Sequence, residues 1–125
     1  MARKKLTLDQ FLKDDIPITT VNSHGVYDQC VDVVLMYKGY DDYFILLVAN
    51  TEDGYRCGYN CMGNGEGGGA FPHSKFSKPY DDKRKCLRNF LMDFRNNGLY
   101  VSVKDFKQCV DETILSLRQL DLFDF

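Results

Sequence analysis

The stretch from residue 31 to residue 62 constrains the fold most, because it contains three consecutive segments with strand character. Residues 31–37 carry apolar side chains at alternate positions, which is the period of a β-strand with one buried face. Residues 43–49, YFILLVA, are apolar almost without interruption, which predicts a central strand covered on both faces. Residues 55–62, YRCGYNCM, alternate again, so the three segments together predict a three-stranded antiparallel β-meander.

Turn and capping signals surround this meander. Residues 38–42, KGYDD, and the pair Asp53-Gly54 predict its two hairpin turns. Upstream, the sequence from Thr7 to Gln10 has the form of a capping box. It predicts a short helix over residues 8–14 that stops before Pro17.

Two further helices are predicted after the meander. The first is capped by Asp81 or Asp82, has apolar residues at helical spacing, and ends at Asn97-Gly98. A brief strand is predicted at residues 99–101, and a second capping box at residues 102–105 opens the last helix.

This order of elements predicts an α+β fold, α-β-β-β-α-α, with the helices packed on one face of the sheet. At 125 residues the chain is long enough for one hydrophobic core. We therefore predict a single domain over residues 1–118, followed by a short tail over residues 119–125.

The glycine-rich residues 63–69, GNGEGGG, are predicted to begin a loop that runs to about Tyr80, because glycine loses the most backbone entropy in a strand or helix. Gly63, Gly65 and Gly68 satisfy the G-x-G-x-x-G pattern of dinucleotide sites. No helix follows directly and no βαβ unit surrounds the glycines, so a flexible or ligand-wrapping loop is the favoured interpretation.

Charge and cysteine content favour a cytosolic protein. The net charge is −2, so the molecule as a whole is not expected to attract nucleic acid or an acidic membrane electrostatically. No apolar run reaches the ~18 residues of a membrane span, and MARKK at the start leads into a polar helix, not into the apolar region of a signal peptide. Five cysteines, an odd number, are predicted to be free thiols.

A local excess of positive charge lies between His73 and Arg88. Its cations are Lys75, Lys78, Lys83, Arg84, Lys85 and Arg88. In the predicted fold they surround the N-terminus of a helix, where backbone N–H groups favour phosphate. They are the best local candidates for a contact with DNA or RNA, and a solvated helix face is the alternative interpretation.

The order helix, three strands, helix, with basic residues at the start of the second helix, resembles a double-stranded-RNA-binding domain over residues 7–97. The resemblance is one of topology. It implies an alternative function for the chain, namely a nucleic-acid-binding module that uses the basic start of the helix near residues 81–97.

Residues for catalysis or for a metal are few. Cys57 and Cys61 lie four positions apart, which separates their Cα atoms by roughly 13 Å in a strand. That is too far for one ion, so packing in the core is favoured over a zinc site that would also use His73. Nothing places His24 or His73 beside a nucleophile, and we predict neither an enzyme nor a cofactor.

The end of the chain, RQLDLFDF, is apolar beyond the point where the core-facing positions of the last helix stop. Gln119-Leu120-Asp121-Leu122-Phe123 resembles the pentapeptide by which bacterial replication and repair proteins, and some phage and plasmid proteins, dock on the DNA polymerase sliding clamp. The resemblance implies a polar contact for Gln119, an adjoining hollow for Leu120, and a hydrophobic pocket for Leu122 with Phe123. Asp121 would face solvent. A tail that packs on its own domain is the alternative.

A second resemblance covers residues 54–72. A Tyr-Arg-x-Gly-Tyr strand, three consecutive glycines and Pro72 are similar to small uncharacterised proteins of phages and mobile elements, some of which end in a clamp-like tail. Together, these features predict a small cytoplasmic accessory protein of a bacterium, phage or mobile element that modulates DNA replication or repair.

Overall fold

The computed structural model describes residues 3–63, 65–96 and 104–123, and within these ranges all side chains except those of residues 66, 104–105 and 119–123. In chain order, its elements are β1 (Lys5–Leu6), α1 (Leu8–Lys13), β2 (Val31–Gly39), β3 (Asp42–Thr51), β4 (Gly54–Gly63), β5 (Glu66–Ala70), α2 (Lys83–Arg95) and α3 (Lys104–Phe123).

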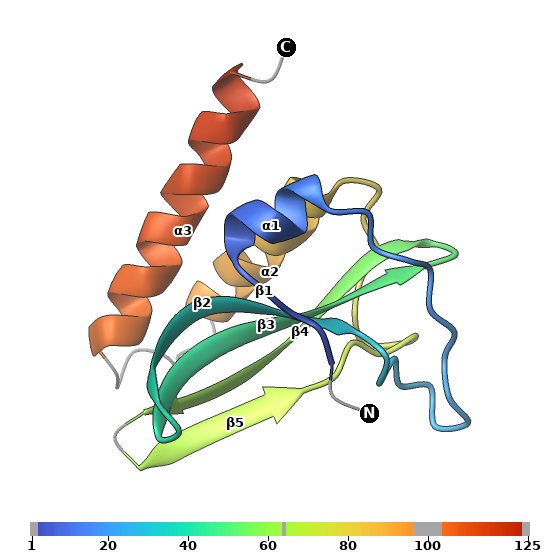
Figure 1. The fold of residues 1–125 in the computed structure, drawn as a ribbon, viewed down its shortest axis with the longest axis horizontal. Helices are drawn as coiled ribbons and strands as arrows, with labels where there is room; N and C mark the ends of the chain where they lie inside the picture. Colours follow the sequence, from blue (N-terminus) through green and yellow to red (C-terminus); the bar gives the residue numbers. More distant parts are fainter. Residues whose placement is uncertain (1–2, 64, 97–103, 124–125) are drawn as a thin grey trace.

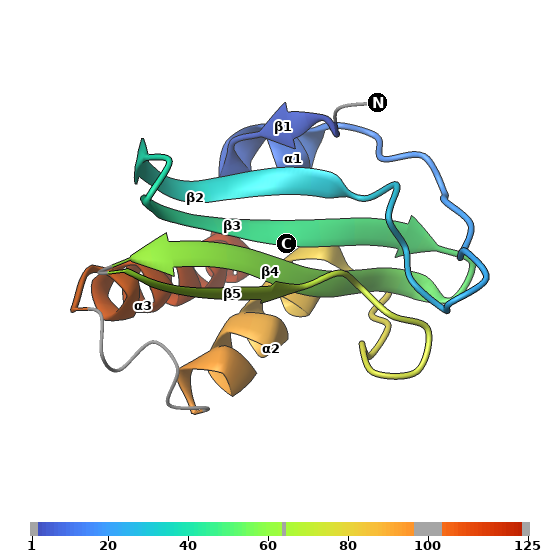
Figure 2. The ribbon, with the colours of Figure 1, turned by 90° about the horizontal axis from the view of Figure 1, so that it is seen from below.

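The predicted meander is present as β2, β3 and β4, within a larger sheet than predicted. The sheet has five strands in the order β1-β2-β3-β4-β5, with β1 parallel to β2 and the other neighbours antiparallel. Figure 2 views it from the face opposite the helices, which lie behind it. The α+β class is confirmed, and the three-stranded, all-antiparallel form of the prediction is replaced by a mixed five-stranded sheet.

The helix starts follow the local signals. The Thr7 hydroxyl accepts the Gln10 backbone N–H at 3.2 Å, and the Gln10 side chain accepts the Thr7 N–H at 3.0 Å, which completes the predicted capping box of α1. Asp82 is the N-cap of α2, and its carboxylate accepts the Lys85 N–H at 3.1 Å. The predicted glycine cap at 97–98, the strand at 99–101 and the start of the box at 102–105 lie outside the described residues.

The glycine-rich segment was wrongly predicted as a loop from its start. Residues 66–70 form β5, which pairs with β4 from Gly63↔Glu66 to Tyr59↔Ala70. The low strand propensity of glycine is overcome here because the two backbones approach closely. A Cβ atom on Gly69 would lie 2.7 Å from the carbonyl oxygen of Tyr59, so a larger residue would push the strands apart.

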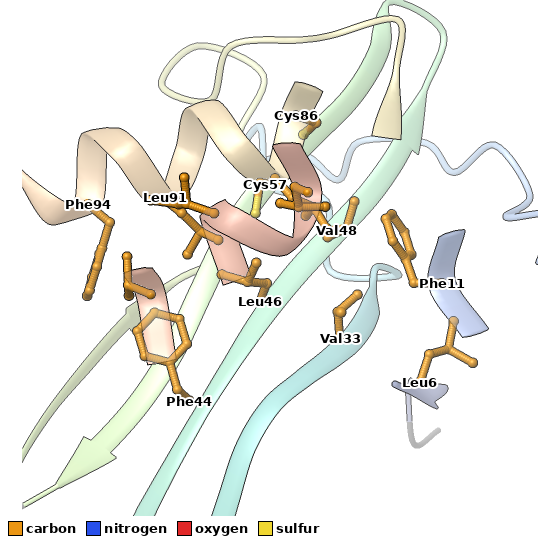
Figure 3. Packing of buried hydrophobic residues seen from close by; sticks show 14 of the residues in the cluster. Leu6, Phe11, Val33, Phe44, Leu46, Val48, Cys57, Cys86, Leu91 and Phe94 are labelled. Carbon is orange, nitrogen blue, oxygen red and sulfur yellow. The ribbon is translucent and has the colours of Figure 1, made fainter. Parts of the chain in front are cut away.

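The helices bury one face of the sheet. Figure 1 shows α1, α2 and α3 arranged around the same side, and Figure 3 shows the side chains that meet there. Phe44 of β3 lies at the centre, with its ring centroid 5.2 Å from that of Phe94 of α2 and 5.4 Å from that of Phe106 of α3, both edge to face. Further along, Leu46 and Val48 of β3 are fully buried. This layer is the main core.

The opposite face of the sheet is covered by loops. Ile45, Leu47 and Ala49 of β3 pack there with Tyr27 and Cys30, which precede β2. Within the predicted run, residues 44–49 are therefore buried on both faces and Tyr43 is partly buried, as the unbroken apolar sequence predicts.

Candidate functional site

The pentapeptide Gln119–Phe123 lies on the last turns of α3. The described buried side chains of this helix are Phe106, Val110, Thr113, Ile114 and Leu117. Figure 1 shows the end of α3 extending past the sheet and past the other two helices. The backbone of the pentapeptide is helical, and its side chains lie outside the described residues.

Lys83, one of the six predicted nucleic-acid contacts, is partly buried, and its amine makes contacts within the fold. Its amine donates to the carbonyl oxygens of Phe11, at 2.7 Å, and of Asp14. It also lies 5.0 Å from the centroid of the Phe11 ring. Burial lowers the pKa of this amine, against the opposing effect of Asp15 and Asp14. Lys83 thus closes the C-terminal end of α1 and joins it to α2.

The other predicted cations occupy several places around α2. Lys75, Lys78 and Lys85 are exposed, and the Lys78 amine lies 5.6 Å from the centroid of the Tyr80 ring. The Arg84 guanidinium approaches the Asp82 carboxylate to 4.0 Å. Arg88 is half-buried. The cluster predicted from the sequence is therefore divided between the surface and contacts within the fold.

The order that resembles a double-stranded-RNA-binding domain runs from α1 through β2, β3 and β4 to α2. β5 and the segment at residues 71–80 are inserted between the third of these strands and the helix. The topology on which the resemblance rests is present with this insertion.

A pocket of about 500 Å³ lies beside β4, and part of its lining comes from the segment that the sequence predicted as a flexible or ligand-wrapping loop. Its floor is the segment Cys57–Tyr59, and one wall comes from α2. The other wall comes from residues 71–80, which leave the sheet after β5 and return to it at Tyr80; we call this segment the arch. The lining residues of α2 are Cys86, Phe90, Asp93 and Phe94.

The arch is held in place by Arg56, which is 6 % exposed on the loop-covered face of the sheet. Its guanidinium donates to the carbonyl oxygens of Ser74, at 3.1 Å, and of Ser77, and to the Asp53 carboxylate at 3.3 Å. It also stacks over the Tyr27 ring, 5.9 Å from its centroid. One charged side chain thereby fixes both carbonyls at the turn of the arch.

The ring of His73 serves the same purpose. Its Nδ1 accepts the Lys75 backbone N–H at 3.0 Å, so the Nε2 that lies 3.2 Å from the His24 carbonyl oxygen is the protonated nitrogen. The Phe76 ring packs against this ring at a tilt of 37°, with 4.6 Å between the ring centroids, and Phe76 is itself 84 % exposed. Both ring nitrogens of His73 thus have partners within the protein, and the ring offers the pocket its face.

Two thiols lie in the lining where the sheet meets α2. The Cys57 thiol donates to the Gly58 carbonyl at 3.3 Å, and the Cys86 thiol donates to the Tyr55 carbonyl at 3.3 Å. Burial raises the pKa of Cys57 well above its ordinary value, and the neighbouring Cys86 adds to the effect. All five cysteines are free, as predicted, and the raised pKa of Cys57 keeps its thiol protonated at neutral pH.

Among the described residues, no group of three metal-ligating side chains converges, and no helix has the length and apolarity to cross a bilayer. Comparison with known protein families, with curated proteins and with solved structures found no match for the chain.

Proposed function

We propose that this chain is a small, non-enzymatic accessory protein that docks on the DNA polymerase sliding clamp through Gln119–Phe123 and so modulates replication or repair. The observation that carries the proposal is the sequence QLDLF itself. Leu122 and Phe123 are the anchors that would fill a preformed hydrophobic groove, and such apolar anchors supply most of the affinity of a short peptide.

The position of the pentapeptide supports this role. It follows Leu117, which is fully buried, and lies where α3 extends past the rest of the molecule. A clamp could approach this end of the helix without displacing the described core. The pentapeptide would then tether the globular part to the clamp.

Docking as an extended peptide requires the last turns of α3 to unwind, and the sequence there keeps the energy of unwinding low. The last turn has no basic residue to interact with the negative end of the helix dipole. Asp121 places a negative charge at that end, which destabilises it by about 0.3–1 kcal/mol. The terminal turn of a helix also has fewer backbone hydrogen bonds to lose than an interior turn.

The test is binding of the purified chain to a purified bacterial sliding clamp, measured by surface plasmon resonance. The double variant Leu122→Ala, Phe123→Ala should weaken binding by roughly 30-fold or more, because loss of a central anchor costs about 2 kcal/mol or more. Leu115→Ala is the matched control, since Leu115 lies on the same helix, outside the pentapeptide, and is 56 % exposed. It should bind like the parent.

A nuclease-treated sample separates direct docking from capture through bound nucleic acid, which is the mechanism that the resemblance to RNA-binding domains would provide. Direct docking survives the treatment. Equal binding by the double variant and the parent, or loss of all binding after nuclease, would refute the proposal.

A further inference from the structure

The pocket beside β4 lies at a break in the strand pairing. Tyr55 exchanges backbone hydrogen bonds with Tyr80, at 2.6 Å and 2.9 Å, on the side of β4 that faces away from β3. β5 pairs with the same side from Tyr59 onward. Cys57 lies between the two and lines the pocket.

The backbone of Cys57 points toward this break. The register of β3 with β4 is regular, so alternate residues of β4 direct their N–H and C=O to the same side. Because Tyr55 directs both groups to the arch, Cys57 directs its own two groups to that side as well. A continued β5 would place Pro72 opposite Cys57, since Tyr59 is paired with Ala70.

Pro72 cannot complete this pair. It has no N–H to donate, and its carbonyl oxygen instead accepts the Tyr27 N–H at 2.9 Å. The chain turns over Gly58 at this point, where a Cβ atom would lie 2.0 Å from the Ala70 carbonyl oxygen. The strand pairing ends, and one donor and one acceptor of Cys57 face the pocket side by side.

Aromatic rings form the wall next to this backbone edge. The Tyr59 ring lies 5.2 Å from that of Phe94 and 6.1 Å from that of Phe90, and the two phenylalanine rings are stacked at 6.2 Å. All three residues line the pocket. Such a wall favours a flat ring, which stacks on the face of an aromatic side chain or meets its edge.

The charges around the pocket balance. Among the described residues that line it, the Lys and Asp side chains are Lys78 and Asp93, one of each sign and both exposed. A ligand with a net charge would therefore be bound little more tightly than a neutral one by electrostatic attraction. Peptide strands are disfavoured, because the edge of β4 is already paired on both sides of Cys57, with Ala70 of β5 at Tyr59 and with Tyr80 of the arch at Tyr55.

We propose that this pocket is a binding site for a neutral, flat nitrogen heterocycle that carries an N–H donor beside a C=O acceptor, such as a lactam or a nucleobase-like ring. The ligand pairs with the backbone of Cys57 as a neighbouring strand would, and its ring packs against Phe90, Phe94 and Tyr59. The volume of about 500 Å³ lies in the range of pockets for small organic ligands.

The probe for the test is isoquinolin-1(2H)-one, titrated into the ¹⁵N-labelled chain and followed through backbone amide shifts. The shifts should be largest at Cys57, Gly58 and Tyr59. The N-methyl analogue keeps the ring and the acceptor but lacks the donor, and it should bind at least tenfold more weakly.

Two protein variants locate the site. Asp93→Tyr places a large side chain at an exposed lining position of α2 and should weaken binding at least tenfold. Lys85→Tyr makes the same kind of change at an exposed position of α2 that does not line the pocket, and it should bind like the parent. Circular dichroism without ligand checks that both variants are folded.

Shifts centred elsewhere, equal binding of the N-methyl analogue, or no shift up to the solubility limit of the probe would each overturn the assignment. Normal binding by Asp93→Tyr would overturn it too. The pocket lies beside β4 and the pentapeptide on the last turns of α3, so these results test the pocket separately from clamp docking.

Discussion

Replacement of Gly58 by alanine should destabilise the fold strongly, although it adds only one methyl group. The new Cβ atom would lie 2.0 Å from the Ala70 carbonyl oxygen and 2.9 Å from the Pro72 nitrogen. Both neighbours are backbone atoms, so no side-chain rotation can relieve the contact. The Ala70 carbonyl must move by about 1 Å to restore even a 3.0 Å separation.

The expected loss follows from what this movement disturbs. Overpacking of a tight site costs about 1–3 kcal/mol. The displaced segment also carries the Tyr59↔Ala70 pairing and the hydrogen bond from Tyr27 to Pro72, each worth about 1 kcal/mol. We expect Gly58→Ala to lower the free energy of unfolding by roughly 3 kcal/mol.

Urea unfolding followed by far-UV circular dichroism measures this free energy, and Gly68→Ala is the matched control. A Cβ atom on Gly68 would lie 3.5 Å from the Tyr59 hydroxyl, which is ordinary contact. Alanine at position 68 should leave the free energy of unfolding unchanged or raise it by at most about 1 kcal/mol, because it restricts the unfolded chain. A free energy of unfolding for Gly58→Ala within about 0.5 kcal/mol of the parent is typical of neutral surface changes. That result would refute the close passage of residues 70–72 over Gly58.

Two further predictions concern Lys83 and Cys30. Lys83→Met keeps most of the apolar stem but removes the amine that binds the end of α1, so it should lower the free energy of unfolding by about 2 kcal/mol. Lys85→Met, at an exposed site, is the control and should have almost no effect. Burial raises the pKa of Cys30 to about 11 from an ordinary 9.0, so the folded state keeps a proton that the unfolded state releases. The contribution of this thiol to the free energy of unfolding is fully present below pH 9, and it falls by roughly 2 kcal/mol as the pH rises toward 11. In urea titrations over that range, Cys30→Ala should therefore show a smaller loss of stability than the parent. An identical pH profile for the variant and the parent would show that Cys30 ionises alike in both states.

The elements that the sequence predicts well are those decided by neighbours in the chain. The capping box at Thr7 and the cap at Asp82 need only residues three positions away. The run at 43–49 is apolar on both faces because both faces are covered, so its composition reports its position in the sheet.

The features that the sequence did not predict depend on distant partners. β5 has no alternating pattern, because residues 67–69 are glycines, and at Gly67 and Gly69 a Cβ atom would lie within 2.8 Å of the backbone of β4. Lys83 was assigned to nucleic acid by its basic neighbours, yet its partner Phe11 lies 72 positions away. The pocket arises where Pro72 ends one pairing and Tyr80 begins another, and no local motif marks that place.

The two edge strands have a consequence for self-association. β1 has two residues, and β5 has five, three of them consecutive glycines with no side chain to pack against a second sheet. Exposed edges of long, apolar strands are the templates on which sheets from separate molecules join. Borders as brief as β1 and β5 give a second copy few backbone groups to pair with, and the glycines of β5 add no side chain to such a contact.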